Sequence, residues 1–163
     1  MINLKKVKKL IFVDMHATTR APMASEIFRY NLYTDENINR DFKILSRGVV
    51  VNFSEPMNQK AEAVLAGNDI YYKEYQSREF TPEEVDEYTL VLAMDSDVRD
   101  ILLEKYSELN EDNTFVLAFF VGEELETMDP YGEPIVKYGL CFEALKETTR
   151  NLLLKLENGD GNE

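Results

Sequence analysis

Apolar and polar residues form blocks along the chain, and the short apolar blocks predict strands. Four such runs stand out, at residues 7–13, 42–45 (running on to 51), 89–94 and 114–121, and a shorter extended piece is expected at 69–75. The clearest of these runs are apolar at nearly every position instead of alternating, which is typical of strands buried on both faces of a parallel sheet.

Longer blocks with apolar residues at three- and four-residue spacing predict helices between and after these strands. Pro22 suits the first residue of a helix, because its missing N–H costs nothing there. Further starts are indicated by the capping box Thr81-Pro82-Glu83-Glu84 and by Asp95, while Gly67 closes the helix that precedes the piece at 69–75. A last helix is predicted over 135–156.

Strands that alternate with amphipathic helices predict an α/β fold. We expect a doubly wound, open, parallel four-stranded sheet with helices on both faces, built as one domain over residues 1–157 with a frayed tail at 158–163. Ligands in such folds bind beyond the carboxyl ends of the strands. Asp14, Asp95 and the loop that holds Asp129 all follow predicted strands, so these acids and Arg20 are expected to converge there.

Charge narrows the range of functions. The 163 residues carry a formal charge of −13, which disfavours binding to nucleic acid or to anionic membranes. Residues 1–20 nevertheless hold five basic residues and one acid, while the remainder holds 13 basic and 30 acidic residues, a net of −17. The basic residues of this first segment are Lys5, Lys6, Lys8, Lys9 and Arg20. We therefore expect any anion site to lie near the N-terminal segment.

The single cysteine, Cys141, excludes an internal disulfide and a zinc site built from several thiolates. Its position in the last predicted helix indicates a small core residue. No apolar run approaches the ~20 residues that span a bilayer, and the basic start is followed by too short an apolar stretch for a signal peptide. We expect a soluble, cytoplasmic protein that is a monomer or a weak homodimer.

Three stretches of the chain carry a family resemblance: FVDMHATTRAPMASEIFR, EYTLVLAMDSDVRDIL and MDPYGEPIVKYGLCFEAL. Together they resemble the low-molecular-weight protein tyrosine phosphatases. Members of that family have a strand, then Cys, five residues, Arg, Ser or Thr, usually Pro, and a helix. Their general acid lies in an Asp-Pro-Tyr loop before the last helix. The resemblance implies the phosphatase I-like fold.

Carried over by this resemblance, Asp14 stands where the family has its nucleophilic cysteine. Arg20 would bind phosphate in bidentate fashion, and Asp129 would protonate the leaving group. Other departures are His16 and Ala17, where Gly and Asn are common, and Ala21, which replaces a hydroxyl. The implied anion-binding loop is Asp14, Met15, His16, Ala17, Thr18, Thr19 and Arg20, with Met15 and Tyr131 as pocket walls.

The missing cysteine leads to the hypothesis of a catalytically impaired or inactive phosphatase-like protein with a binding or regulatory role. In this interpretation Asp14 pairs with Arg20, no cofactor is needed, and the partner is a phosphorylated protein or a small anion. The alternative is a slow phosphomonoester or phosphotyrosine hydrolase with Asp14 as nucleophile and Asp129 as acid, in which a divalent cation is held with help from Asp95 or Asp129. A third possibility is an interaction module that no longer uses the pocket.

Structural interpretations of the same residues stand beside these functional ones. Asp95 is expected to brace the loop or to cap the following helix, and Asp129 fits an ordinary turn as well as an acid. His16 is a candidate base without a visible partner. The tyrosines of the 69–75 segment, Tyr71, Tyr72 and Tyr75, are most simply half-buried strand residues.

Overall fold

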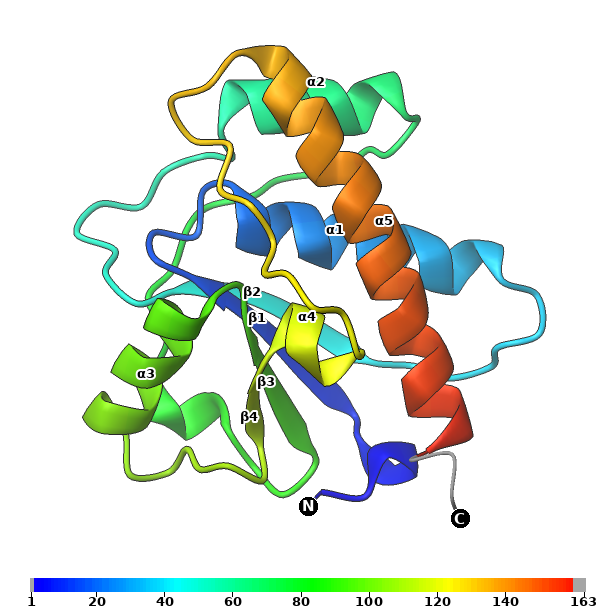
Figure 1. Ribbon diagram of the computed structural model, residues 1–163, viewed down its shortest axis with the longest axis vertical. Coiled ribbons are helices and arrows are strands. Elements are labelled where there is room, and N and C mark those ends of the chain that lie inside the picture. Colours follow the sequence, from blue (N-terminus) through cyan, green and yellow to red (C-terminus); the bar gives the residue numbers. More distant parts are fainter. Residues whose placement is uncertain (1, 160–163) are drawn as a thin grey trace.

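The computed structural model describes residues 2–159 (Figure 1). Four strands are present: β1 (Lys9–Asp14), β2 (Lys43–Gly48), β3 (Thr89–Ala93) and β4 (Thr114–Val116). The helices are α1 (Arg20–Thr34), α2 (Gln59–Gly67), α3 (Ser96–Lys105), α4 (Leu117–Phe120) and α5 (Ile135–Asn158), with 3-10 turns η1 (Leu4–Lys6) and η2 (Pro82–Glu84).

The strands form one parallel sheet in the order β2-β1-β3-β4, which confirms the predicted four-stranded α/β fold. The chain runs from β1 to β2 on one side and then crosses to β3 on the other. The order therefore reverses between β1 and β3, and this is the point where open α/β sheets bind their ligands. Asp14 ends β1 and Asp95 lies two residues after the end of β3, so both lie at this point.

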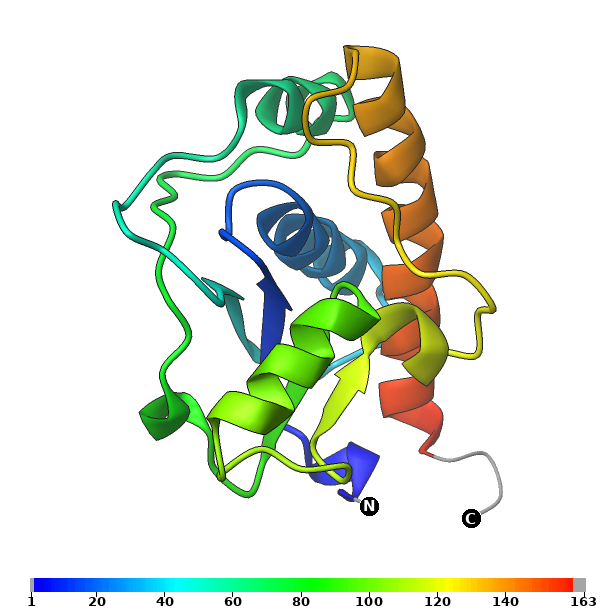
Figure 2. The same cartoon turned by 60° about the vertical axis from the view of Figure 1, so that its left-hand side comes forward.

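Two hydrophobic cores cover the two faces of the sheet. Leu10, Phe12, Leu90 and Leu92 point to the face covered by α1, α2 and α5, and the alternate residues point to the face covered by α3. Figures 1 and 2 show α1 and α5 on one side of the sheet and α3 on the other. These three layers explain why the central strands are apolar at successive positions.

The last predicted strand is shorter than expected. Only Thr114–Val116 pairs with β3, and the next four apolar residues form α4, where the ring of Phe120 lies 4.6 Å from that of Phe115. β3 ends at Ala93, so no strand remains for a longer β4 to pair with. A continuous apolar run does not by itself distinguish a strand from a buried helix.

Two other local predictions differ from the structure, and a third is confirmed in part. α1 begins at Arg20, two residues before Pro22, and residues 69–75 form no strand. The helix start predicted at Thr81-Pro82 is present as η2, which begins at Pro82. The Thr81 side chain makes no capping bond to the backbone of η2, however, and the carboxylate of Glu84 instead receives two bonds of 2.8 Å from Arg47.

At its C-terminal end, α5 includes Asn158, the first residue of the predicted tail, and residues 160–163 of that tail lie outside the described part. Within residues 2–159, no helix has the length and apolar character to span a membrane.

Candidate active site

The loop between β1 and α1 is organised around the buried carboxyl group of Asp14. Its Oδ1 accepts a hydrogen bond from the Ala17 N–H at 2.5 Å, and its Oδ2 accepts one from the Ala21 N–H at 2.9 Å. Burial raises the pKa of Asp14, although these two bonds and the positive charge of Arg20 oppose the rise. The carboxyl group thus occupies two amide donors of the loop, one of them in the first turn of α1.

The left-handed backbone of Ala17 closes the loop tightly. Ala17 has a φ of 61°, which is unusual for a residue with a Cβ. Two hydroxyl groups outside the loop support this residue. The Tyr75 hydroxyl donates to the Ala17 carbonyl at 2.5 Å and lies 3.0 Å from Ser46 Oγ. Burial raises the pKa of Tyr75 to about 12, so the hydroxyl keeps its proton for this bond.

Gly48, at the end of β2, lets the backbone of the loop approach the sheet closely because it has no side chain. A Cβ added there would lie 2.9 Å from the His16 carbonyl carbon, 3.0 Å from the Ala17 nitrogen and 2.8 Å from Val51 Cγ2. Any larger residue would therefore push the loop away from the sheet. Sequence reasoning gave neither Gly48 nor Tyr75 a part in the site, because both support the loop only through contacts distant in sequence.

Arg20 is engaged by groups other than Asp14. Its Nη2 lies 2.7 Å from Asp95 Oδ2 and 3.9 Å from Asp129 Oδ2, and its Nη1 donates to the Thr127 carbonyl at 2.9 Å. The expected ion pair between Asp14 and Arg20 is therefore wrong, because the amides of the loop satisfy Asp14 instead.

Asp95 has both of the roles predicted for it. Its Oδ1 accepts the Val98 N–H at 2.8 Å and caps α3, while its Oδ2 holds Arg20. This one carboxylate thus ties the start of α3 to the arginine of the loop.

The segment before α5 brings Asp129 to the Arg20 guanidinium. Asp129 is exposed, and its Oδ1 accepts the Tyr131 N–H at 3.1 Å, so the Asp-Pro-Tyr turn forms as well. Cys141, on α5, lies behind it with Sγ 3.7 Å from the Met128 carbonyl, and burial raises the pKa of this thiol to about 12. Cys141 is accordingly the buried residue that the sequence predicted.

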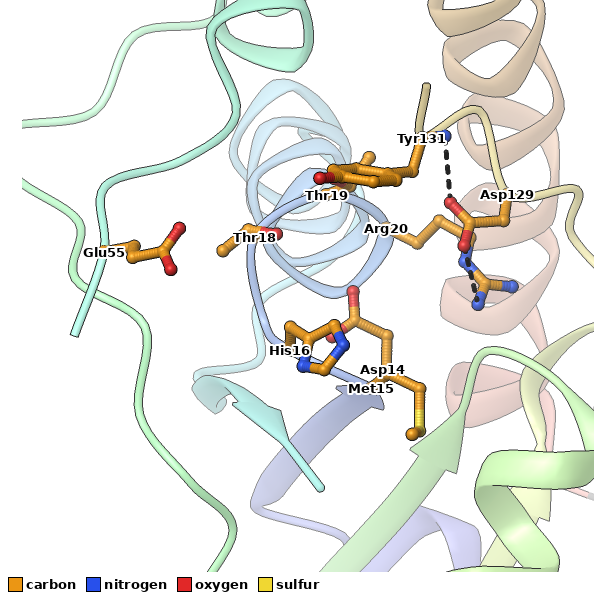
Figure 3. A pocket seen from close by; sticks show the side chains of 9 residues that line it. All are labelled: Asp14, Met15, His16, Thr18, Thr19, Arg20, Glu55, Asp129 and Tyr131. Atoms are coloured by element: carbon orange, nitrogen blue, oxygen red, sulfur yellow. Dashed lines mark hydrogen bonds and ion pairs between the residues drawn. The ribbon is translucent and has the colours of Figure 1, made fainter. Parts of the chain in front are cut away.

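These elements enclose a cavity of about 360 Å³ (Figure 3). It is lined by Asp14, Met15, His16, Thr18, Thr19, Arg20, Glu55, Asp129 and Tyr131. The structure thus brings together the predicted site residues, except that Ala17 is buried beneath the loop. Glu55 was missed: it follows β2 in a loop whose path no sequence signal indicated.

The cavity is lined by residues of the N-terminal segment, but the lysines of that segment do not surround it. Lys9 begins β1, about 17 Å from Asp14 at ~3.3 Å per residue, and Lys8 precedes it, so both lie beyond the opposite end of the strand from the cavity. The His16 ring, for which the sequence indicated no partner, has its Nδ1 2.9 Å from the Val50 carbonyl.

Within residues 2–159, no group of three or more His, Cys, Asp or Glu side chains is arranged to hold a metal ion. Both oxygens of Asp95 already accept hydrogen bonds, from Arg20 and Val98. A divalent cation would therefore find no preformed set of ligands here.

A parallel sheet with a tight loop that ends in arginine, facing an Asp-Pro-Tyr turn, defines a protein of the phosphotyrosine phosphatase class. Residues 9–160 match the family model of the low molecular weight phosphotyrosine protein phosphatases, and the chain belongs to this family.

Individual relatives agree with this assignment. A protein-arginine-phosphatase from Geobacillus stearothermophilus is 27% identical over 150 residues, which cover 91% of this chain and 96% of that protein. The low molecular weight protein tyrosine phosphatase from T. tengcongensis superposes with a TM-score of 0.81 at 28% identity, covering 91% of this chain and 99% of that one. A YwlE arginine phosphatase variant with a phosphorylated active-site serine gives 0.80 at 27% identity, covering 95% and 99%.

Proposed function

We propose that this chain is a low-molecular-weight phosphatase relative whose hydrolytic activity is absent or strongly impaired and whose pocket serves a binding or regulatory role. In this proposal Asp14 takes the position of the family's nucleophilic cysteine. The observation that carries it is the pair of hydrogen bonds from the Ala17 and Ala21 amides to the Asp14 carboxyl group. Donors that would stabilise a thiolate or a phosphate are thereby already used.

Electrostatics support the same conclusion. An ionised Asp14 would repel a phosphate dianion at close range, and Asp129 adds a second negative charge nearby. Arg20, the residue that would offset both, shares its charge with Asp95 and Asp129. A carboxylate is also a weaker nucleophile than a thiolate toward phosphorus, and enzymes that use one commonly employ a divalent cation.

The test is phosphate release from a phosphoarginine peptide, a phosphotyrosine peptide and an aryl phosphate across a pH series. The names of the relatives suggest the first two substrates. We expect the natural chain to release no phosphate above background and Asp14→Cys to gain measurable turnover. Robust turnover by the natural chain that is lost in Asp14→Asn would contradict the proposal.

A second candidate is slow hydrolysis through an aspartyl phosphate. The relative with a phosphorylated active-site serine supports it, because an oxygen nucleophile in a related site accepts a phosphoryl group. Asp14 would attack phosphorus, Asp129 would protonate the leaving group, and water would then cleave the acyl phosphate. Mass spectrometry of the protein quenched during turnover, with and without Mg²⁺, tests it. A phosphoryl adduct on Asp14 that hydroxylamine removes is the expected signature, and a protein that stays unmodified with every substrate would dismiss it.

A further inference from the structure

The cavity that resembles a phosphate site is predominantly acidic. Asp14, Glu55 and Asp129 contribute three carboxyl groups, while Arg20 is the one lysine or arginine among the lining residues. The Arg20 guanidinium is itself bound by Asp95, which does not line the cavity. With carboxylates ionised, the lining residues and Asp95 together carry four negative charges and one positive charge. Such a balance favours a cation and opposes an anion.

We infer that this cavity binds the guanidinium group of an arginine side chain on a partner protein, with the Asp14 carboxyl group fixed where a bound anion would otherwise lie. The inference rests on the proposed function, because a loop that still bound phosphate would have its amides and its arginine free. Asp14 thus acts as an anion built into the chain, and the face that it presents to the cavity accepts hydrogen bonds.

An independent observation indicates that the cavity is built for a polar ligand. The Thr19 side chain lines the cavity, its residue is only 5% exposed, and its hydroxyl oxygen has no hydrogen-bond partner among the described residues. Buried hydroxyls are normally satisfied, so an orphaned one marks a place where a ligand group completes the bonding. A guanidinium N–H would supply the missing donor.

The walls of the cavity favour arginine over lysine. Tyr131 is 70% exposed and Met15 37%, so an aromatic ring and a thioether are both available to the side chain. A planar guanidinium stacks on an aromatic face, and its five N–H groups reach acceptors on several sides, whereas an ammonium group is a compact point charge. Figure 3 shows carboxyl groups entering from three different segments, at Asp14, Glu55 and Asp129.

The test is an NMR titration of the isotopically labelled full chain with capped Gly-Gly-Arg-Gly-Gly. The matched control peptide carries citrulline, which keeps the shape and removes the charge, and phenyl phosphate is the anionic probe. We expect the arginine peptide to shift the amide resonances of residues 14–20 and 129–131, and the citrulline peptide to bind at least about tenfold more weakly. Phenyl phosphate should produce no shifts in the loop.

Variants locate the binding. Glu55→Gln and Tyr131→Leu should each lower the affinity for the arginine peptide by roughly three- to fivefold. Glu104→Gln, which removes an exposed acid on α3 outside the cavity, should have no effect and controls for the general acidity of the chain. Glu55 is exposed, and its side chain makes no hydrogen bond or ion pair with the described residues, so its substitution leaves folding intact.

Each other outcome has a defined meaning. Phenyl phosphate that binds at the loop without being cleaved would overturn the arginine inference and leave the proposed function standing. Arginine binding that is equal in Glu55→Gln and Glu104→Gln, or no shifts at residues 14–20, would also overturn it. Phosphate release in the same samples reports on the proposed function separately.

Discussion

The two segments that face each other across the cavity are held in different ways. The Asp14 loop, residues 14–20, is fixed by backbone contacts: Val49 and Val50 donate to its first two carbonyls and Asn58 donates to that of Thr18. The acid segment, residues 121–134, is held mainly by side chains of other elements, among them those of Arg20, Ser96 and Thr148. One side of the cavity is thus part of the fold, while the other depends on a few polar contacts.

Arg20 connects the two segments, because it belongs to the Asp14 loop and contacts Thr127 and Asp129 in the acid segment. The residue that the family resemblance assigns to phosphate is here the anchor of the acid segment through the Thr127 carbonyl. A ligand that recruited Arg20 would have to compete with this contact and with Asp95. Ligand binding and the position of Asp129 are therefore coupled through one side chain.

The largest effect is expected from breaking this connection with Arg20→Gln. The change leaves Asp95 without its cation and the Thr127 carbonyl with a shorter donor, which should cost about 2–3 kcal/mol in the free energy of unfolding. Urea denaturation measures the loss, and limited proteolysis should show faster cleavage within residues 121–134. Arg150→Gln, at an exposed position on α5, is the control and should change stability by less than about 0.5 kcal/mol. Equal stability of the two variants would show that Arg20 does not anchor the segment.

Gly48→Ala tests the Asp14 loop itself. The new Cβ meets backbone atoms of His16 and Ala17 at 2.9 and 3.0 Å, so the loop must move, at a cost of about 2 kcal/mol. Gly67→Ala is the matched control, since a Cβ there meets nothing within 4 Å and a helical position favours alanine by about 0.5–1 kcal/mol. Urea denaturation should show a lower free energy of unfolding for Gly48→Ala and a higher one for Gly67→Ala. An unchanged free energy of unfolding in Gly48→Ala would mean that the loop is more adaptable than its contacts indicate.

A smaller effect is expected for the hydroxyl that pins the loop. Tyr75→Phe keeps the ring and removes the hydrogen bond to the Ala17 carbonyl, which should lower the free energy of unfolding by about 1 kcal/mol. Tyr71→Phe removes a hydroxyl from a side chain that is 73% exposed and should be neutral within about 0.5 kcal/mol. Thermal and urea unfolding of the pair measure the difference, and a loss of the same size in both variants would remove Tyr75 from the loop's supports.

The most subtle prediction concerns pH. Because the folded-state pKa of Asp14 is raised above its ordinary value of 3.8, folding takes up protons, and the stability that Asp14 contributes below pH 3.8 is lost as pH rises through the folded pKa. Asp14→Asn lacks this loss. The stability of the variant relative to the natural chain should therefore increase from pH 4 toward neutrality, as measured by urea denaturation at each pH. A difference that is constant over this range would show an unshifted Asp14.

Sequence reasoning reached the sheet and most of the site because their signals are local. The apolar runs that became β1 and β3 and the Asp-Pro-Tyr turn are readable from a few neighbouring residues. The partner of Arg20 was predicted wrongly because amides of the loop competed for Asp14, and such competition depends on backbone geometry. The contributions of Tyr75 and Glu55 arise from segments that cross the loop without a repeating pattern, so only the folded chain reveals them.

Because Cys141 is buried, the reactivity of its thiol reports local opening of the structure. As the sole cysteine of the sequence, fully buried and with its pKa raised to about 12, its thiol reacts with an alkylating reagent only from states in which the core around α5 opens. The rate of labelling therefore measures the free energy of that local opening without an engineered probe. Mass spectrometry can follow the same alkylation while a ligand is added. The labelling rate of a residue that takes no part in the proposed binding chemistry would then show how ligand binding changes the local opening.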